Sequence, residues 1–305
     1  MTAQAGSTRV IYAALAGNFL IAVTKFGAAF FTGSSAMLSE GVHSLVDTGN
    51  EVLLLYGLRK AARPPDEDHP LGHGREVYFW SFIVALLVFA LGAGVSFYEG
   101  ISHLLHPEPV RNIAVNYVVL GLSAVFEGIA WTIALRHFRR EKGRLGYIAA
   151  VRRSKDPTTF TVLFEDTAAL LGLAIAFIAI TAAHILAIPE LDGAGSIGIG
   201  IVLAATAIFL ARESKGLLMG EQALPSVRRR IVELAGADPD VVRVNDVLTV
   251  HLGPTDIVAT LSIEFKDELT TPRLEACVRR IEQRICSELS EVSSVFVRPQ
   301  SASPM

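Results

Sequence analysis

Several ionisable side chains stand inside long apolar segments, where such groups are rare. His43 and Asp47 lie in segment 36–58, and Glu165 and Asp166 lie in segment 158–186. An apolar run of about 20 residues can cross a bilayer, and an ionisable side chain within it faces a cavity or a partner helix rather than lipid. An imidazole together with carboxylates is a ligand set for a divalent cation. We therefore expect these four residues to be metal ligands.

The helical period places the polar residues of segment 36–58 on one stripe. At about 100° per residue, Glu40, His43, Asp47 and Asn50 fall within a sector of roughly 80°. His43 and Asp47 are four residues apart, so both side chains can reach one ion. The alternative is a polar seam between packed helices. Besides the four ligands, three residues are candidates for supporting or pathway positions: Glu40, Asn50 and Asn18.

Other polar residues of the apolar segments leave alternatives open. Glu165 and Asp166 are adjacent and point about 100° apart, so only one of them looks directly into a shared site; both could also mark a helix end at the membrane interface. Lys25 either extends its ammonium towards the interface or pairs with a carboxylate, and it is not expected to be a ligand. Glu127 is expected to make a helix–helix hydrogen bond, with a proton-carrying role as the alternative.

Composition indicates an integral membrane protein with a modest soluble part. The chain has 305 residues, of which 51% are hydrophobic and 19% are charged, and its mean hydropathy is +0.45. Soluble domains carry about 25% charged residues. The net charge of −3 gives no reason to expect nucleic-acid binding. Cys277 and Cys286 lack the spacing of a zinc knuckle or a disulfide framework.

Hydropathy predicts six membrane-spanning helices followed by a soluble domain, with the boundary between 1–212 and 213–305. The spans are expected at 10–31, 36–58, 78–103, 113–135, 158–186 and 194–211. Lysine and arginine gather in the loops 59–75 and 136–155, whereas Arg111 is the one basic residue in the other three loops. The positive-inside rule therefore predicts that both termini are cytoplasmic.

The segment after Arg212 predicts a small α+β domain. Helices are expected at 225–234 and 271–289, and strands at 241–251, 257–265 and 293–298. In the second strand the residues on one face are all apolar, which is typical of a half-buried strand: Ile257, Ala259, Leu261, Ile263 and Phe265. An α-β-β-α-β order places the helices on one face of the sheet.

The loop between the second and third spans offers another candidate metal site. Residues 66–76 concentrate acids and two histidines, and the candidate ligands are Asp68, His69 and His73. The alternative is a structured turn, because Pro70 and the neighbouring glycines favour one.

Together these motifs resemble the cation diffusion facilitator family, in the branch that contains zinc transporter nine. The resemblance rests on six spans, the His43-x-x-x-Asp47 pair, the loop from Asp66 to Arg75, the α-β-β-α-β tail, and the similarity of segments 40–50 and 157–169. It implies a homodimeric divalent-metal/proton antiporter, usually for Zn²⁺, with a ferredoxin-like cytoplasmic domain that helps dimerisation.

Two positions depart from the family pattern. Many zinc members have a histidine four residues before the acid in span five, where this chain has Val162. Many members also bind metal through histidines near the last strand, where this chain has Arg298, and His251 is the domain's single histidine. We therefore expect weak metal sensing in the tail, or none.

The expected function is proton-coupled efflux of a divalent cation, most readily Zn²⁺, by alternating access, from a bacterial inner membrane. No resident cofactor is expected, because the metal ion is cargo. A carrier selective for Mn²⁺, Co²⁺, Fe²⁺ or Cd²⁺ and a membrane-anchored metal-responsive scaffold or regulator remain as alternatives. An enzyme is not expected, because no HExxH pair or activated nucleophile stands in the sequence.

Overall fold

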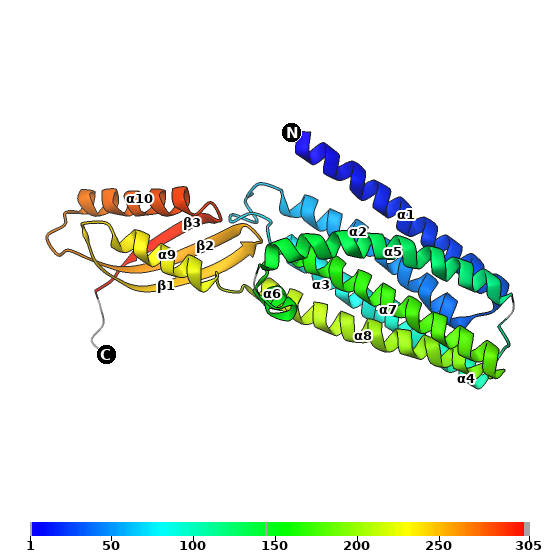
Figure 1. Ribbon diagram of the computed structural model, residues 1–305. Coiled ribbons are helices and arrows are strands. Elements are labelled where there is room, and N and C mark those ends of the chain that lie inside the picture. Colours follow the sequence, from blue (N-terminus) through cyan, green and yellow to red (C-terminus); the bar gives the residue numbers. More distant parts are fainter. Residues whose placement is uncertain (1, 111, 144, 302–305) are drawn as a thin grey trace. The chain divides into compact units, whose positions relative to one another are not determined.

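The computed structural model describes residues 2–110, 112–143 and 145–301. Arg111 and Arg144, which enter the loop-charge pattern, lie outside the described residues. The chain forms two compact units (Figure 1). The first contains residues 1–58, 79–151 and 157–214; the second contains residues 59–78, 152–156 and 215–305. The division after residue 214 lies close to the expected boundary, but the sequence did not indicate that two loops group with the C-terminal residues.

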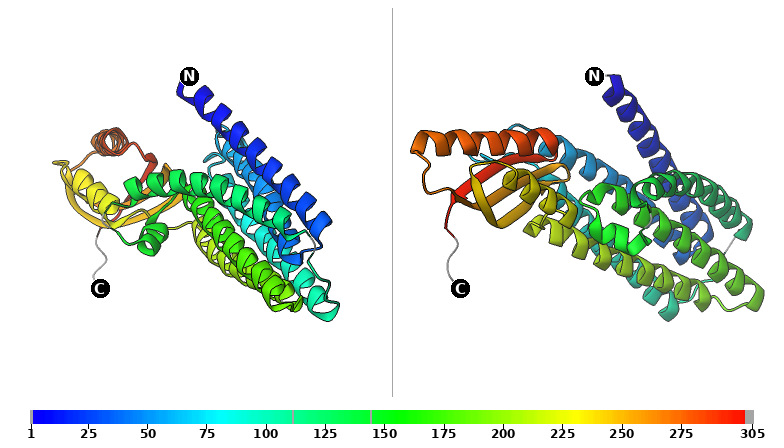
Figure 2. Two further views of the ribbon diagram at one scale, coloured as in Figure 1. Left: turned by 45° about the vertical axis from the view of Figure 1, so that its right-hand side comes forward. Right: turned by 60° about the vertical axis from the view of Figure 1, so that its left-hand side comes forward.

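Long helices make up the first unit, as the six apolar segments predict. α2 is Ser35–Ala61. The next long helix is continuous and consists of α3 (Glu76–Leu87), the π-helical turns of η1 (Val88–Ala93) and α4 (Gly94–Leu105). α5 (Ile113–Lys142) packs against both α1 (Thr2–Thr32) and α7 (Pro157–Leu186) (Figure 2). The remaining helices of this unit are α6 (Tyr147–Arg153) and α8 (Glu190–Met219).

The outer surface of this unit is suited to lipid. Within the described residues, four helices are long and apolar enough to cross a membrane: Glu76–Leu105, Ile113–Arg136, Phe160–Leu186 and Glu190–Met219. Phe30 is 87% exposed and Ile185 is 73% exposed. Apolar surface on this scale is stable when lipid covers it, and helices satisfy their backbone groups internally. The chain is therefore a multi-pass integral membrane protein.

Small residues let α4 and α8 approach closely. A Cβ atom placed on Gly100 would lie 2.8 Å from the carbonyl oxygen of Gly193. Gly200 similarly faces the ring of Phe97 at 3.3 Å. The glycines of segment 193–200 therefore serve helix packing, as small-residue faces do in membranes.

The second unit contains the expected α-β-β-α-β order. α9 is Pro225–Gly236, β1 is Val241–Gly253, β2 is Asp256–Phe265, α10 is Thr271–Glu288 and β3 is Val292–Pro299. The sheet order is β1-β2-β3, with β1 antiparallel and β3 parallel to β2. Pro225 and Pro272 stand in the first turns of their helices, where the missing N–H costs nothing. The small α+β domain is confirmed.

Alternation along β2 separates a covered face from an uncovered one. Ile257, Ala259, Leu261 and Ile263 are buried, and they form one core with Ile281 of α10. On the opposite face Leu248, Thr260 and Phe296 are neighbours in the register of the three strands. Leu248 is 58% exposed and Phe296 is 52% exposed, so no layer formed by the described residues covers this face of the sheet.

The two loops that join the second unit are held by specific contacts. The Tyr78 hydroxyl donates a hydrogen bond to the carbonyl oxygen of Lys155 (3.2 Å). The Lys155 ammonium pairs with the Glu221 carboxylate. A Cβ atom on Gly74 would lie 2.5 Å from the carbonyl oxygen of Leu252, so the loop can approach β1 this closely because it has glycine there.

Candidate functional site

His43 and Asp47 meet in the interior of the helical unit. They lie one turn apart on α2, and His43 Nδ1 is 3.3 Å from Asp47 Oδ1. His43 is 1% exposed. Within the described residues, neither ring nitrogen nor Asp47 Oδ1 has a hydrogen-bond partner. Buried polar atoms are nearly always paired, so this pair has ligand capacity to offer an ion.

α7 brings its two acids to the same interior. Glu165 is buried, and its Oε1 accepts a hydrogen bond from Asn50 Nδ2 of α2 (2.8 Å). Glu165 also interacts electrostatically with Asp47 and Asp166. Asp166 Oδ2 is buried and has no hydrogen-bond partner in the described part of the chain. This hydrogen bond from Asn50 orients Glu165 towards α2.

The four expected ligands share one region but are not gathered around one point. Among the residues that the structure describes, two groups of three His, Cys, Asp or Glu have ligand atoms all within 4.8 Å of one another, and neither group contains His43, Asp47, Glu165 or Asp166. Asp166 still interacts electrostatically with Asp47 and His43. For all four to bind one ion, α2 and α7 would therefore have to bring these side chains closer together.

Glu40 and Asn18, the other candidate supporting residues, contact groups other than His43. Glu40 Oε2 lies 3.0 Å from Lys25 Nζ, so the alternative in which Lys25 pairs with a carboxylate is confirmed. Asn18 Nδ2 donates to Glu51 Oε1 (2.8 Å).

Glu51 and Glu127 are two acids whose place at the site the sequence did not indicate. Glu51 lies one turn beyond Asp47 and interacts electrostatically with Asp47 and Glu127. Glu127 of α5 is 7% exposed and interacts with His43, Asp47 and Lys25. The four-residue spacing of Asp47 and Glu51 was a signal that could have found Glu51, whereas Glu127 required knowledge of how α5 packs.

The loop before α3 forms a compact group of ligands that differs from the expected one. Asp66 Oδ2 is 2.9 Å from His73 Nε2, and Asp66 Oδ1 is 3.2 Å from His69 Nδ1. Asp66, His69 and His73 form one of the two groups that could hold a metal ion, and Asp68 is not part of it. Hydrogen bonds from His73 and from the His69 backbone lower the pKa of Asp66 to about 2. The turn around Pro70 is what points Asp66 back at both histidines.

The other compact group is an ion-pair network. Asp238 accepts hydrogen bonds from Arg280 Nε (3.0 Å) and Nη2 (2.9 Å), and from the Cys277 thiol (3.2 Å). The Arg280 bonds lower the pKa of Asp238 to about 2, and burial raises the pKa of Cys277 to about 12. Because a guanidinium already occupies Asp238 and Asp240, this group stabilises the domain rather than offering a vacant metal site.

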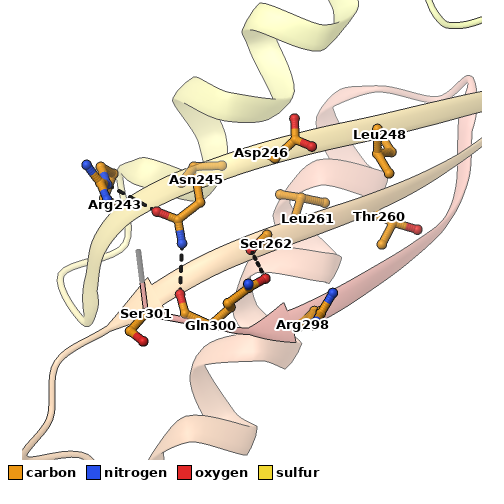
Figure 3. Close-up of a pocket in the computed structure, with 11 residues that line it drawn as sticks. Arg243, Asn245, Asp246, Leu248, Thr260, Leu261, Ser262, Arg298, Gln300 and Ser301 are labelled. Carbon is orange, nitrogen blue, oxygen red and sulfur yellow. Dashed lines mark hydrogen bonds between the residues drawn. The ribbon is translucent and has the colours of Figure 1, made fainter. Parts of the chain in front are cut away.

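The uncovered face of the sheet carries a hollow of about 460 Å³ (Figure 3). Arg243 donates to Asn245 (3.1 Å), and Asn245 donates to the Gln300 carbonyl oxygen (2.8 Å). Ser262 donates to the Gln300 side chain (3.0 Å), and Arg298 also lines the hollow. The lining mixes apolar side chains with two arginines and one acid, Asp246, so it does not form a set of ligands for a divalent cation.

His251, the one histidine of residues 213–305, is buried, and its Nδ1 lies 3.1 Å from the Gly253 carbonyl oxygen. Burial lowers its pKa. This contact supports the turn between β1 and β2.

Curated proteins similar to this chain include several named transporters. "Proton-coupled zinc antiporter SLC30A9, mitochondrial" of Mus musculus is 35% identical over 268 residues, which are 87% of this chain and 47% of the relative. "Metal tolerance protein C4" of Arabidopsis thaliana is 32% identical, covering 86% of this chain and 58% of the relative. "Cation-efflux pump FieF" of Cronobacter sakazakii is 29% identical, covering 92% and 88%. The chain spans about half the length of the SLC30A9 relatives it matches.

Among solved structures, "MamM-CTD 215-293" matches at 25% identity and a TM-score of 0.24, covering 25% of this chain and 96% of that one. The family model described as "Cation efflux transmembrane domain" matches residues 11–219. That match covers α2 and α7, the helices that carry His43, Asp47, Glu165 and Asp166. The resemblance seen in the sequence is thereby confirmed: the chain belongs to the cation efflux family, that is, to the cation diffusion facilitators.

Proposed function

We propose that this chain exports a divalent cation, most readily Zn²⁺, in exchange for protons. The observation that carries the proposal is the buried His43–Asp47 pair, whose facing atoms lack hydrogen-bond partners within the described residues. Imidazole and carboxylate ligands suit Zn²⁺, and they bind it with lower affinity than thiolates do. The names of the SLC30A9 relatives, which describe proton-coupled zinc antiport, support the proposed exchange of a zinc ion for protons.

The exchange follows from competition at one set of ligands. A divalent ion binds deprotonated imidazole and carboxylates, so binding and protonation exclude each other. When the site opens to a more acidic compartment, protons compete for His43 and the acids and release the ion; an unperturbed histidine titrates near pH 6.5, within the range that such compartments reach. α7 would close towards α2 on binding and part from it on release.

We further propose six spans, with both termini cytoplasmic in a bacterial inner membrane. α1 and α2 supplement the four clearly apolar helices; α2 carries its acids on the interior face, which lowers its hydropathy without exposing charge to lipid. The basic loops support this orientation. A reporter fused after Met305 that is found outside the cytoplasm would exclude it.

We also propose that the chain works as a homodimer, with its ferredoxin-like C-terminal unit contributing to the interface. Leu248, Thr260 and Phe296 leave the sheet uncovered, and a second copy would remove this apolar surface from water. Chemical cross-linking in membranes should give a dimer that Phe296→Asp weakens. A monomer in the unaltered protein would refute this.

Zinc uptake into proteoliposomes under a pH gradient tests the transport proposal. His43→Ala and Asp47→Ala should each abolish uptake, whereas the matched controls His184→Ala and Asp267→Ala, at exposed positions, should transport normally. Uptake at the unaltered rate in both site variants would refute the proposal.

The same proteoliposomes decide between the remaining alternatives. A complete absence of metal flux from the unaltered protein would favour a membrane-anchored regulator instead. Competition by Mn²⁺, Co²⁺, Fe²⁺ and Cd²⁺ decides which ion the site selects.

A further inference from the structure

A buried ion pair lies one turn from the proposed metal site. Lys25 of α1 and Glu40 of α2 are both 0% exposed, and Lys25 Nζ is 3.0 Å from Glu40 Oε2. The ammonium also donates a hydrogen bond to Ser44 Oγ (2.8 Å). Two full charges inside a membrane unit are costly to bury, and they persist when each compensates the other.

The pair is enclosed by three helices. Glu40 Oε1 has no hydrogen-bond partner within the described residues and lies against Gly172 of α7, where a Cβ atom would collide with it. Lys25 therefore reaches Glu40 from α1, while α7 presents a bare backbone to the other oxygen. The carboxylate has room here because α7 has no side chain at this position.

The charges of the pair interact electrostatically with residues of the proposed metal site. Glu40 stands three residues before His43 on the same stripe of α2, and Ser44 directly follows His43. The Lys25 ammonium interacts electrostatically with His43 and with Glu127, and Glu40 interacts with both as well. The net charge of Lys25 and Glu40 would therefore affect how tightly His43 holds an ion.

We propose that Lys25 is a resident cation that neutralises Glu40 and keeps this carboxylate out of the ligand set of the transported ion. The inference rests on the proposed function. A divalent ion held by His43, Asp47 and one or two acids of α7 can be released to protons, whereas one further free carboxylate would bind it more tightly. Lys25 is thus a positioning residue that sets affinity through Glu40, and it does not touch the ion.

This role predicts opposite effects for the two partners. Lys25→Met frees Glu40, so the affinity for a divalent ion should rise by about tenfold or more; Glu40→Gln leaves an uncompensated ammonium near the site, so the affinity should fall by about tenfold or more. The double variant Lys25→Met/Glu40→Gln removes both charges and should return to within about threefold of the unaltered protein.

Cobalt titration of the purified full-length chain in detergent measures these affinities. The absorption bands of bound Co²⁺ also report a change of ligand number. Each titration is compared with the same protein carrying His43→Ala, which isolates the ion that depends on His43. Thermal unfolding of every variant provides a measure of folding that is independent of binding.

A merely structural pair would give another result: both single variants would unfold more easily, while the folded protein would bind Co²⁺ with unaltered affinity. That outcome would overturn the inference. If Lys25→Met does not fold, Glu40→Gln and the double variant still decide, because rescue by the second substitution is expected only if the charges act on the ion. Failure of the unaltered protein to bind Co²⁺ through His43 would instead refute the proposed function.

Discussion

Gly172→Ala should destabilise the helical unit because its methyl group would occupy the place of a charged oxygen. The new Cβ atom would collide with Glu40 Oε1. A carboxylate on a free side chain would simply rotate away, but Glu40 is fully buried and its other oxygen is held by Lys25 at 3.0 Å. Either Glu40 gives up the ammonium, or α2 and α7 separate.

The cost can be worked out from these contacts. Inserting a methyl group into a packed interior costs about 1–3 kcal/mol. Weakening a hydrogen bond between charged groups costs a further 1.5–3 kcal/mol or so. Replacing glycine by alanine within a helix stabilises the folded state by about 1 kcal/mol. The expected net loss is about 1.5–5 kcal/mol of unfolding free energy.

Equilibrium unfolding of the purified protein by SDS in mixed micelles measures this loss. Gly121→Ala is the matched control, since it adds the same methyl group to α5 at an exposed position with nothing within 4 Å. In a Glu40→Ala background, where the carboxylate is absent, Gly172→Ala should cost less than about 1 kcal/mol. An equal cost of Gly172→Ala in both backgrounds, or a cost no greater than that of Gly121→Ala, would show that the methyl group does not displace the Glu40 carboxylate.

Three other perturbations test separate parts of the structure. Asp238→Asn should lower the opening free energy of α10 by up to about 2 kcal/mol in hydrogen exchange, because the Asp238 pKa is lowered from 3.8 to about 2 and each unit corresponds to about 1.4 kcal/mol. This stabilisation should be complete above about pH 4 and lost as the pH falls towards 2, since the folded form holds the carboxylate ionised; a flat profile would contradict it. Asp192 accepts hydrogen bonds from the Ser34 hydroxyl (2.8 Å) and the Ser35 amide (2.6 Å) at the start of α2. Asp192→Asn should therefore destabilise the helical unit by about 1–3 kcal/mol in SDS unfolding. Glu190→Gln is the control and should have a smaller effect. Asp66→Asn should weaken Cd²⁺ binding, measured by calorimetry, by about tenfold or more, because Asp66 is grouped with His69 and His73. Asp68→Asn is the control and should leave Cd²⁺ binding unchanged. Equal effects of the two substitutions would show that Asp66, His69 and His73 do not form the binding site.

Local periodicity was enough to predict most of the elements. The alternation 257–265 predicted five residues on the core face of β2. The structure buries Ile257, Ala259, Leu261 and Ile263, whereas Phe265 at the end of the strand is only partly buried against the same core. The proline positions likewise predicted where α9 and α10 begin. These predictions succeed because the repeat of a strand and the first turn of a helix are set by neighbouring residues alone.

Spacing along one helix was sufficient for one half of the candidate site. His43 and Asp47 had to share a face, and they meet at 3.3 Å. The loop shows the limit of such reasoning: Asp68 lies next to His69 in the sequence, but the turn directs Asp66 to both histidines. Without a regular period, sequence distance does not predict which side chains meet.

By itself, therefore, the sequence determined that the chain has long apolar helices, the α+β tail, the family, and the stripe of polar residues on α2, because each depends on composition or on a local repeat. The tertiary structure alone decided that Lys25 pairs with Glu40, that Asn50 orients Glu165, and that Glu51 and Glu127 belong to the same interior. Those pairings depend on how separate helices rotate and pack against one another, which no spacing within a single helix encodes.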